Sequence, residues 1–202
     1  MSERKSHWEK VYQTKMPSEV SWTQVVPQTS LDFINSFDLP KDAKIIDIGG
    51  GDSNLVDYLL EQGFTDITVL DISKAALLRA KKRLGKKSQL VKWIVSDITS
   101  FSAPQHYDLW HDRATFHFLT TEQQINAYLG NARKAVVSYL VMGTFSENGP
   151  DQCSGLPINK YNEDQLKTQL ENGFQKIYCV TEDHITPFQT HQNFLFCSFR
   201  RN

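Results

Sequence analysis

The sequence contains little cysteine, and the arrangement of what it has predicts neither a disulfide framework nor a zinc site. Three of the 202 residues are cysteines, Cys153, Cys179 and Cys197. They are odd in number, widely spaced and without a CxxC pair, whereas disulfide scaffolds and zinc sites use paired, closely spaced cysteines. No cluster of histidine, cysteine and carboxylate residues has metal-ligand spacing, so we expect no metal.

An excess of charge of one sign and long apolar runs are also lacking. Lys and Arg together number 22 against 23 for Asp and Glu, so the net charge is -1. This balance gives no attraction to nucleic acid or to an anionic membrane. No run approaches the ~18–20 apolar residues of a membrane span, and the first ten residues are too polar for a signal peptide. We therefore expect a cytoplasmic protein with neither nucleic acid nor membrane as a partner.

Short strand-like runs alternate with helical patterns along most of the chain. The expected strands are 44–49, 66–72, 89–98, 107–112, 139–145, 174–182 and 192–200, and the expected helices include 53–62, 73–84, one from about Thr121, and 162–171. Four strand–helix units indicate parallel strands, and the two closing strands have only a loop between them. The prediction is an α/β, Rossmann-like fold: a seven-stranded, mostly parallel sheet with a C-terminal antiparallel hairpin and helices on both faces.

The stretch before the first strand is expected to cover the ligand-binding edge of this sheet. Residues 7–15 and 29–37 can each form a helix. Ligands of open α/β sheets bind beyond the carboxyl ends of the strands, where such helices would lie. We expect a single domain over residues 1–202, with residues 1–38 as a helical cover over the cofactor site.

The strongest local signal is a buried strand that turns through glycines into a helix, Ile45-Ile46-Asp47-Ile48-Gly49-Gly50-Gly51-Asp52-Ser53-Asn54. Glycines let backbone N–H groups approach a ligand closely, so Gly49, Gly51 and Asn54 are candidate cofactor-binding residues. The dinucleotide fingerprint GxGxxG is incomplete because Asn54 replaces its third glycine. Asp47 would crowd a pyrophosphate but suits an ammonium group. The turn therefore favours S-adenosylmethionine over NAD.

Carboxylates also end the next two expected strands. Asp71 lies at a strand end where a carboxylate can accept hydrogen bonds from a ribose diol, and Ile72 beside it can pack on an adenine face. Asp97, after the third strand, is suited to accept from an adenine amino group. Each of these aspartates could instead be only a helix cap or a turn residue.

These motifs resemble those of class I S-adenosylmethionine-dependent methyltransferases over essentially the whole chain. DIGGGDSNL resembles the first motif of that superfamily, VLDI at 69–72 the second, and SDI at 96–98 the adenine-binding motif, which adds Ile98 to the candidates. HWEKVY, EVSW, DLWHDRATFHFLT, GPDQCSGLP and EDHITP resemble a bacterial subgroup without an assigned substrate. The DRA-type element is also similar to thiopurine methyltransferases and to DKGT-containing protein-lysine methyltransferases. The resemblance implies S-adenosyl-L-methionine as cofactor.

The acceptor site is expected where the fourth strand ends, at Trp110-His111-Asp112-Arg113. His111 or Asp112 would line the site and orient the acceptor as the catalytic residues. Alternatively, His111 packs near the methionine end of the cofactor and Asp112 pairs with Arg113. Trp22 could close over the cofactor or serve as a core anchor.

Three further polar candidates are expected to be structural: His117 as a core histidine, Cys153 as a buried thiol, and His184 in a loop.

The function favoured by the sequence is methyl transfer to a small-molecule acceptor. Protein-lysine methylation and binding of the cofactor without turnover stay open as alternatives. An NAD-linked oxidoreductase is disfavoured by Asn54 and by the antiparallel ending of the sheet.

Overall fold

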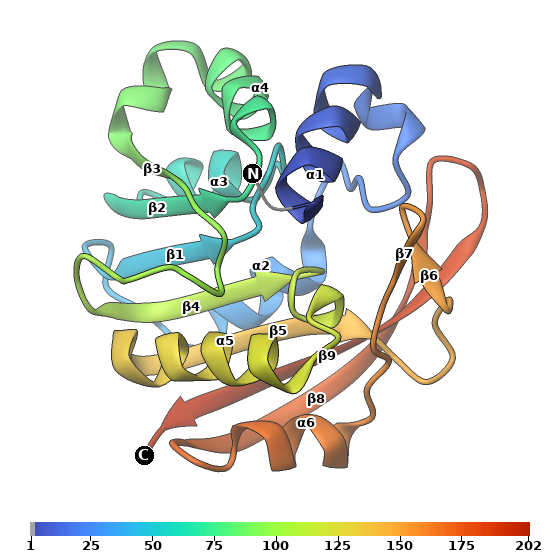
Figure 1. The fold of residues 1–202 in the computed structure, drawn as a ribbon. Helices are drawn as coiled ribbons and strands as arrows, with labels where there is room; N and C mark the ends of the chain where they lie inside the picture. Colours follow the sequence, from blue (N-terminus) through green and yellow to red (C-terminus); the bar gives the residue numbers. More distant parts are fainter. Residues whose placement is uncertain (1–2) are drawn as a thin grey trace.

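A computed structural model describes residues 3–202, and its centre is one seven-stranded sheet in the order β3-β2-β1-β4-β5-β9-β8 (Figure 1). The first five strands are parallel, whereas β9 runs antiparallel to β5 and β8 antiparallel to β9. The strands are β1 Lys44–Ile48, β2 Asp66–Asp71, β3 Val91–Val95, β4 Tyr107–Arg113, β5 Val136–Phe145, β8 Phe174–Ile185 and β9 His191–Arg201. The predicted fold, a mostly parallel sheet with an antiparallel hairpin, is confirmed.

Helices cover both faces of the sheet. The α-helices are α1 Glu3–Thr14, α2 Gln28–Asn35, α3 Leu55–Glu61, α4 Lys74–Leu84, α5 Glu122–Ala135 and α6 Glu163–Leu170. Short 3₁₀ turns occupy η1 Pro17–Glu19, η2 Gly85–Leu90 and η3 Phe116–Phe118, and a small hairpin joins β6 Gln152–Cys153 to β7 Leu156–Pro157. One core lies under α5 and α6, and the other lies under α2, α3 and α4.

Side-chain caps explain where several helices begin. The hydroxyl of Ser73 accepts a hydrogen bond from the Ala76 N–H at the start of α4, as its sequence position predicts. Thr121 and Asn162 each form a capping box with a glutamine three residues later, at the starts of α5 and α6. Residues 96–106, between β3 and β4, form no helix, so this crossover is a loop.

Alternation along β4 sends successive side chains to opposite cores. Trp110 packs in the core with α5, whereas Leu109 packs in the core with α2 and α3. Because the side-chain period of a strand is two, His111 and Arg113 share the face of Leu109, and Asp112 shares that of Trp110. This alternation decides which of the predicted acceptor-site residues reach the cavity described below.

The N-terminal segment lies in two different places. Helix α1 lies beside α4 at the end of the sheet to which the arrows of β1 and β2 point (Figure 1). Helix α2 instead packs on a sheet face, where the ring of Phe33 stacks on that of Tyr178 at 4.5 Å. Only the first part of the expected cover thus lies at the carboxyl ends of the strands.

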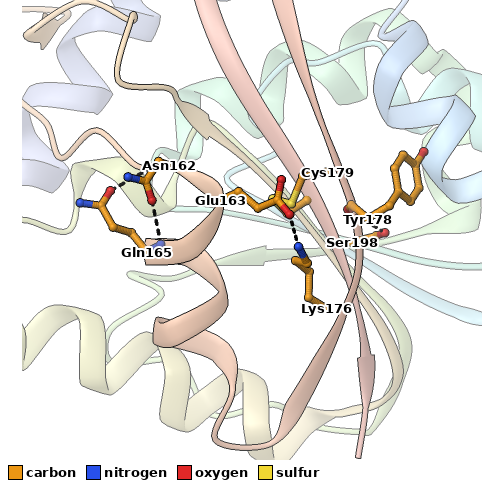
Figure 2. The surroundings of a disulfide bond; sticks show 8 residues. Asn162, Glu163, Gln165, Lys176, Tyr178, Cys179 and Ser198 are labelled. Atoms are coloured by element: carbon orange, nitrogen blue, oxygen red, sulfur yellow. Dashed lines mark hydrogen bonds and ion pairs between the residues drawn. A yellow bond between two sulfur atoms is a disulfide. The ribbon is translucent and has the colours of Figure 1, made fainter.

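The last two strands are joined by a disulfide between Cys179 and Cys197, which lie opposite each other in the β8–β9 register. The sequence-based expectation of no disulfide framework is therefore wrong for this pair. Spacing along the chain hid the pair, because an antiparallel hairpin brings together residues that are 18 positions apart. Figure 2 shows the bond close to the start of α6, near the ion pair of Lys176 with Glu163.

Among residues 3–202, no helix is long and apolar enough to cross a membrane.

Candidate functional site

A cavity of about 230 Å³ opens at the carboxyl ends of the parallel strands. Its walls come from α1, the segment after η1, the glycine turn, and the residues that follow β2, β3, β4 and β5. Of the residues predicted to bind the cofactor, those that line it are Trp22, Asp47, Gly49, Asn54, Asp71, Ile72, Asp97 and Ile98. The structure therefore brings almost all of the predicted set to one place.

The glycine turn after β1 packs too closely for side chains. Gly49 and Gly51 have φ values of +63° and +53°, which L-residues rarely adopt. A Cβ on Gly49 would lie 1.7 Å from Oγ1 of Thr115, and one on Gly51 would lie 2.6 Å from Oη of Tyr12. Gly51 is not itself among the lining residues, but its backbone N–H donates to the carboxylate of Asp71.

Asp47 lies at the floor of the cavity and is held by His111. Nδ1 of His111 is 2.7 Å from Oδ1 of Asp47, and its Nε2 is 2.9 Å from the hydroxyl of Ser30 on α2. His111 is 1% exposed and lines the cavity, with both ring nitrogens engaged. Its neighbours thus hold the ring in place, and whether His111 orients the acceptor or packs near the methionine end of the cofactor stays a prediction.

Asp71 ends β2 beside the turn and is almost fully buried. Burial raises its pKa to about 7, and the nearby charge of Asp52 adds to the rise, while the N–H groups of Ser73 and Gly51 oppose it. Its Oδ1 accepts from the Ser73 N–H at 2.7 Å. The phenol of Tyr12 from α1 lies close to Asp71, and the charge of Asp71 therefore helps to raise the pKa of that phenol. A buried carboxylate with unused acceptor capacity suits a ligand that brings hydroxyl donors.

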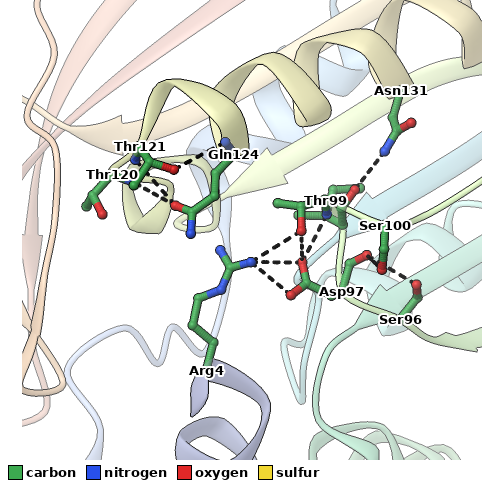
Figure 3. A network of polar contacts seen from close by, with 10 residues as sticks. Arg4, Ser96, Asp97, Thr99, Ser100, Thr120, Thr121, Gln124 and Asn131 are labelled. Atoms are coloured by element: carbon green, nitrogen blue, oxygen red, sulfur yellow. Dashed lines mark hydrogen bonds and ion pairs between the residues drawn. The ribbon is translucent and has the colours of Figure 1, made fainter. Parts of the chain in front are cut away.

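Asp97 lies at the opposite end of the cavity and forms an ion pair with Arg4 of α1 (Figure 3). Nη2 of Arg4 is 2.8 Å from Oδ2 of Asp97, and the backbone and hydroxyl of Thr99 both donate to Oδ1. This ion pair ties the N-terminal helix to the loop after β3.

Asn54 and Trp22 connect the segment after η1 to the glycine turn. The side-chain amide of Asn54 donates to the carbonyl oxygens of Gln24 and Val25. The ring of Trp22 lies 5.6 Å from that of Trp8 and 6.2 Å from that of Tyr12. The aromatic side chains of α1 and Trp22 therefore form one cover over the cavity.

Asp112 does not reach the cavity, contrary to the expectation that it lines the acceptor site. Its carboxylate accepts from Oη of Tyr128 at 2.7 Å and from the Thr115 N–H at 2.9 Å, on the α5 side of the sheet. Burial raises its pKa to about 6, although these hydrogen bonds act to lower it. The alternative pairing of Asp112 with Arg113 is also wrong, because the two point to opposite faces. Asp112 anchors the turn after β4.

Of the remaining polar candidates, only Cys153 lines the cavity. His117 is fully buried and stacks on Phe145 at 4.5 Å, but neither ring nitrogen has a partner, and burial lowers its pKa to about 3. Cys153 lines the cavity, and burial raises the pKa of its thiol to about 11. His184 contacts the carbonyl oxygen of Ser21 at 2.6 Å. All three are neutral packing groups here.

The chain is similar to proteins of known class over its central part. A sequence profile for a methyltransferase domain matches residues 46–138. Over 105 residues, the chain is 31% identical to malonyl-[acyl-carrier protein] O-methyltransferase of Anoxybacillus flavithermus, which covers 51% of this chain and 39% of the relative. Over 119 residues, it is 24% identical to the eEF1A lysine and N-terminal methyltransferase of Mus musculus, 58% of this chain and 17% of the relative. The chain thus spans less than half the length of either curated relative.

The whole fold is also shared with a solved structure. The 1,6-didemethyltoxoflavin-N1-methyltransferase of Burkholderia thailandensis, solved with 1,6-didemethyltoxoflavin and S-adenosylhomocysteine, superposes with a TM-score of 0.72 at 15% identity, over 98% of this chain and 87% of that one. Residues 46–138 therefore match the methyltransferase-domain family, and the chain has the fold of a solved methyltransferase.

The cavity offers groups that suit S-adenosylmethionine, the cofactor expected from the sequence. The strand order β3-β2-β1 sets Asp97, Asp71 and Asp47 side by side along the sheet edge. That row offers acceptors for an adenine amino group, a ribose diol and an ammonium group in turn. A side chain on the glycine turn would collide with its neighbours beside Asp47 and Asp71. Because glycine has no side chain, the backbone of the turn can approach a ligand closely.

Several residues of the site were not predicted from sequence. Arg4, Trp8 and Tyr12 of α1 and Arg113 of β4 all line the cavity. The spacing of Arg4, Trp8 and Tyr12 at four-residue intervals places them on one face of a helix and could have identified that face. Arg113 lies in the stretch expected to form the acceptor site, but it was expected there only as a pairing partner for Asp112.

Proposed function

We propose that this protein is a class I S-adenosylmethionine-dependent methyltransferase that transfers a methyl group from S-adenosylmethionine to a small-molecule acceptor. The observation that carries the proposal is that the cavity continues past the predicted cofactor residues of β3, β2 and β1. Beyond β1 it is lined by residues that end β4 and β5, Arg113 and Phe145, and by Phe194 near the start of the antiparallel strand β9. The bound cofactor supplies an electrophilic methyl group on a sulfonium, and this outer part is where an acceptor would lie.

The residues assigned to the cofactor act by binding and orientation. Asp97 and Ile98 would hold the adenine, Asp71 and Ile72 the ribose, and Asp47 the ammonium group. His111 keeps the carboxylate of Asp47 in position through the 2.7 Å contact. In-line displacement depends mainly on holding the two reacting atoms near contact in a dry site, which the cover of Trp22 and α1 supports.

A small acceptor is favoured by the shape of the outer part. The ring centroid of Trp8 of α1 lies 5.0 Å from that of Phe118 and 5.6 Å from that of Trp22. These aromatic rings cover the outer part of the cavity and would obstruct the entry of a side chain from a protein substrate. The solved relative from Burkholderia thailandensis holds a small heterocycle beside S-adenosylhomocysteine. Protein-lysine methylation is the second candidate, because the relative from Mus musculus is a lysine and N-terminal methyltransferase.

The outer part presents no vacant general base among its lining residues. Both nitrogens of His111 are engaged, and the Cys153 thiol is neutral at physiological pH because burial raises its pKa. The acceptor would therefore attack through an atom that already has a free lone pair at neutral pH, such as a thiolate or a neutral amine.

Transfer of a radioactive methyl group tests the proposal. Purified protein with methyl-labelled S-adenosylmethionine should label members of a panel of small thiols, amines and hydroxy compounds. Label that enters proteins of a cell extract, with none in the panel, would favour protein-lysine methylation. Tight cofactor binding with no transfer to either set would favour a non-catalytic binding protein and contradict the proposal.

The cytoplasmic location stays a prediction. The Cys179–Cys197 disulfide bears on it, because such bonds are rare in reducing compartments. Trapping free thiols while cells are lysed would decide: two reactive thiols from this pair fit the cytoplasm, whereas a fully bonded pair contradicts it.

A further inference from the structure

The outer part of the cavity combines aromatic rings with a single buried cation. We call Trp8, Trp22, Phe118, Phe145 and Phe194 the aromatic wall; all five line the cavity. Phe145 and Phe194 are opposite each other in the β5–β9 register, with ring centroids 4.5 Å apart. A wall of flat rings offers stacking surfaces to a flat ligand.

Arg113 is the charged residue of this outer part, and its guanidinium is poorly satisfied. One nitrogen donates to the carbonyl oxygen of Trp22 at 3.1 Å. The described structure shows no ion pair for Arg113, whereas Arg4 and Arg83, which also line the cavity, each pair with an aspartate. Burial lowers the pKa of Arg113, so the protein bears a desolvation cost to place the charge there.

The two carboxylates whose charges act on Arg113 form no ion pair with it, although Oε2 of Glu182 is buried without a hydrogen-bond partner. Asp47 and Glu182 both raise its pKa by their charge, but neither is within ion-pair distance. Asp47 is bound by His111, and Oε1 of Glu182 accepts from the side chain of Gln24. Only one donated hydrogen bond and no ion pair are described for this guanidinium, so its other N–H donors are available to a ligand in the cavity that Arg113 lines. A planar guanidinium can donate two parallel hydrogen bonds to the two oxygens of one carboxylate.

The position of Arg113 places its N–H donors beside the acceptor rather than beside the adenosine of the cofactor. His111 is opposite Asp47 in the β1–β4 register, and Arg113 lies two residues further along β4, next to Gly143 of β5. The predicted adenosine residues Asp71 and Asp97 follow β2 and β3, on the other side of β1. Arg113 therefore stands across the cavity from the adenosine, on the side of the aromatic wall.

We propose that the methyl acceptor is a flat aromatic anion, whose ring stacks in the aromatic wall and whose carboxylate pairs with Arg113. This inference rests on the proposed function and specifies its substrate class. The neutral thiol of Cys153 and the neutral imidazole of His117 add no competing charge beside the ring.

Binding to the protein saturated with S-adenosylhomocysteine tests the inference without knowledge of the true acceptor. The probes are 2-naphthoate and its uncharged analogue 2-naphthamide, measured by calorimetry. We expect naphthoate to bind at least about tenfold more tightly, since one desolvated charge pair separates the two probes. Arg113→Met should remove this preference, and Arg113→Lys should keep part of it. Arg200→Met, which removes an arginine from the far end of β9, is the matched control and should behave as the wild type.

Two outcomes would overturn the inference. One is equal binding of the two probes to the wild-type protein, a result that needs no variant to fold. The other is that Arg113→Met weakens S-adenosylhomocysteine but not 5′-methylthioadenosine, because Arg113 would then bind the amino-acid carboxylate of the cofactor. If S-adenosylhomocysteine itself does not bind to the wild type, the proposed function fails instead, so the two failures are distinguishable.

Discussion

Asp71 gives cofactor binding a pH dependence that can be calculated from the structure. Burial raises its pKa to about 7 in the ligand-free protein, so its carboxyl group is half protonated at neutral pH. Two ribose hydroxyls bind the ionised form more strongly, because both of its oxygens accept hydrogen bonds, and they therefore stabilise that form. The carboxyl group is about nine-tenths ionised at pH 8 and about one-tenth ionised at pH 6, so affinity should fall about tenfold between them. Binding should release about one proton at pH 6 and almost none at pH 8.

The same shift affects the stability of the ligand-free protein. Because the folded pKa of Asp71 is above the ordinary value of 3.8, its contribution to stability is fully present below that value and is lost as the pH rises through about 7. Ligand-free protein should therefore lose thermal stability over this window, whereas protein saturated with S-adenosylhomocysteine should lose less.

Titration calorimetry with S-adenosylhomocysteine between pH 6 and pH 8, in buffers of different ionisation enthalpy, measures both quantities. Asp71→Asn should bind more weakly at pH 8 by about 1–3 kcal/mol and show little dependence on pH. Asp66, at the first position of the same strand, pairs with Lys92 near the surface and lines no part of the cavity. Asp66→Asn should therefore retain the wild-type profile. An affinity that is flat from pH 6 to pH 8 in the wild type would refute the reasoning.

Three further changes have expected outcomes. Asp112→Ala should lower the free energy of unfolding by about 2–4 kcal/mol, because Tyr128 and the turn after β4 lose a buried acceptor; denaturant unfolding measures this, and an unchanged midpoint would contradict the anchoring role. Gly49→Val should abolish binding of S-adenosylhomocysteine, because its Cβ would overlap Thr115; normal binding would show that the turn is misplaced. Reduction of the Cys179–Cys197 bond should lower stability by about 2–4 kcal/mol, whereas an identical melting temperature with and without reductant would show that the bond is not formed.

Much of the fold could be predicted because local signals and tertiary structure agree. The apolar run before Gly49 and the cap at Ser73 are strong local signals, and both lie where the sequence places them. The short loop between β8 and β9 leaves no room for a helix, so their antiparallel pairing followed.

Residues that belong to the site because they lie at the end of a strand could be predicted from the sequence. Residues that belong to it because their side chain points to one face of the sheet were harder to predict. Asp47, Asp71 and Asp97 mark the ends of three strands, and sheet topology brings such ends together whatever the details of packing. Asp112 was assigned to the cavity because it also ends a strand. Its side chain points to the other face, and only the register against β1 and β5 fixes which of two neighbouring residues faces in. The disulfide pair likewise depends on register.

The central claim is that the row of carboxylates and the glycine turn bind S-adenosylmethionine. Equilibrium dialysis of the folded protein against labelled S-adenosylmethionine tests it most directly. The account predicts retention of about one molecule per chain, displaced by an excess of S-adenosylhomocysteine but not by NAD. No retention by protein whose melting curve shows a cooperative transition would contradict the account.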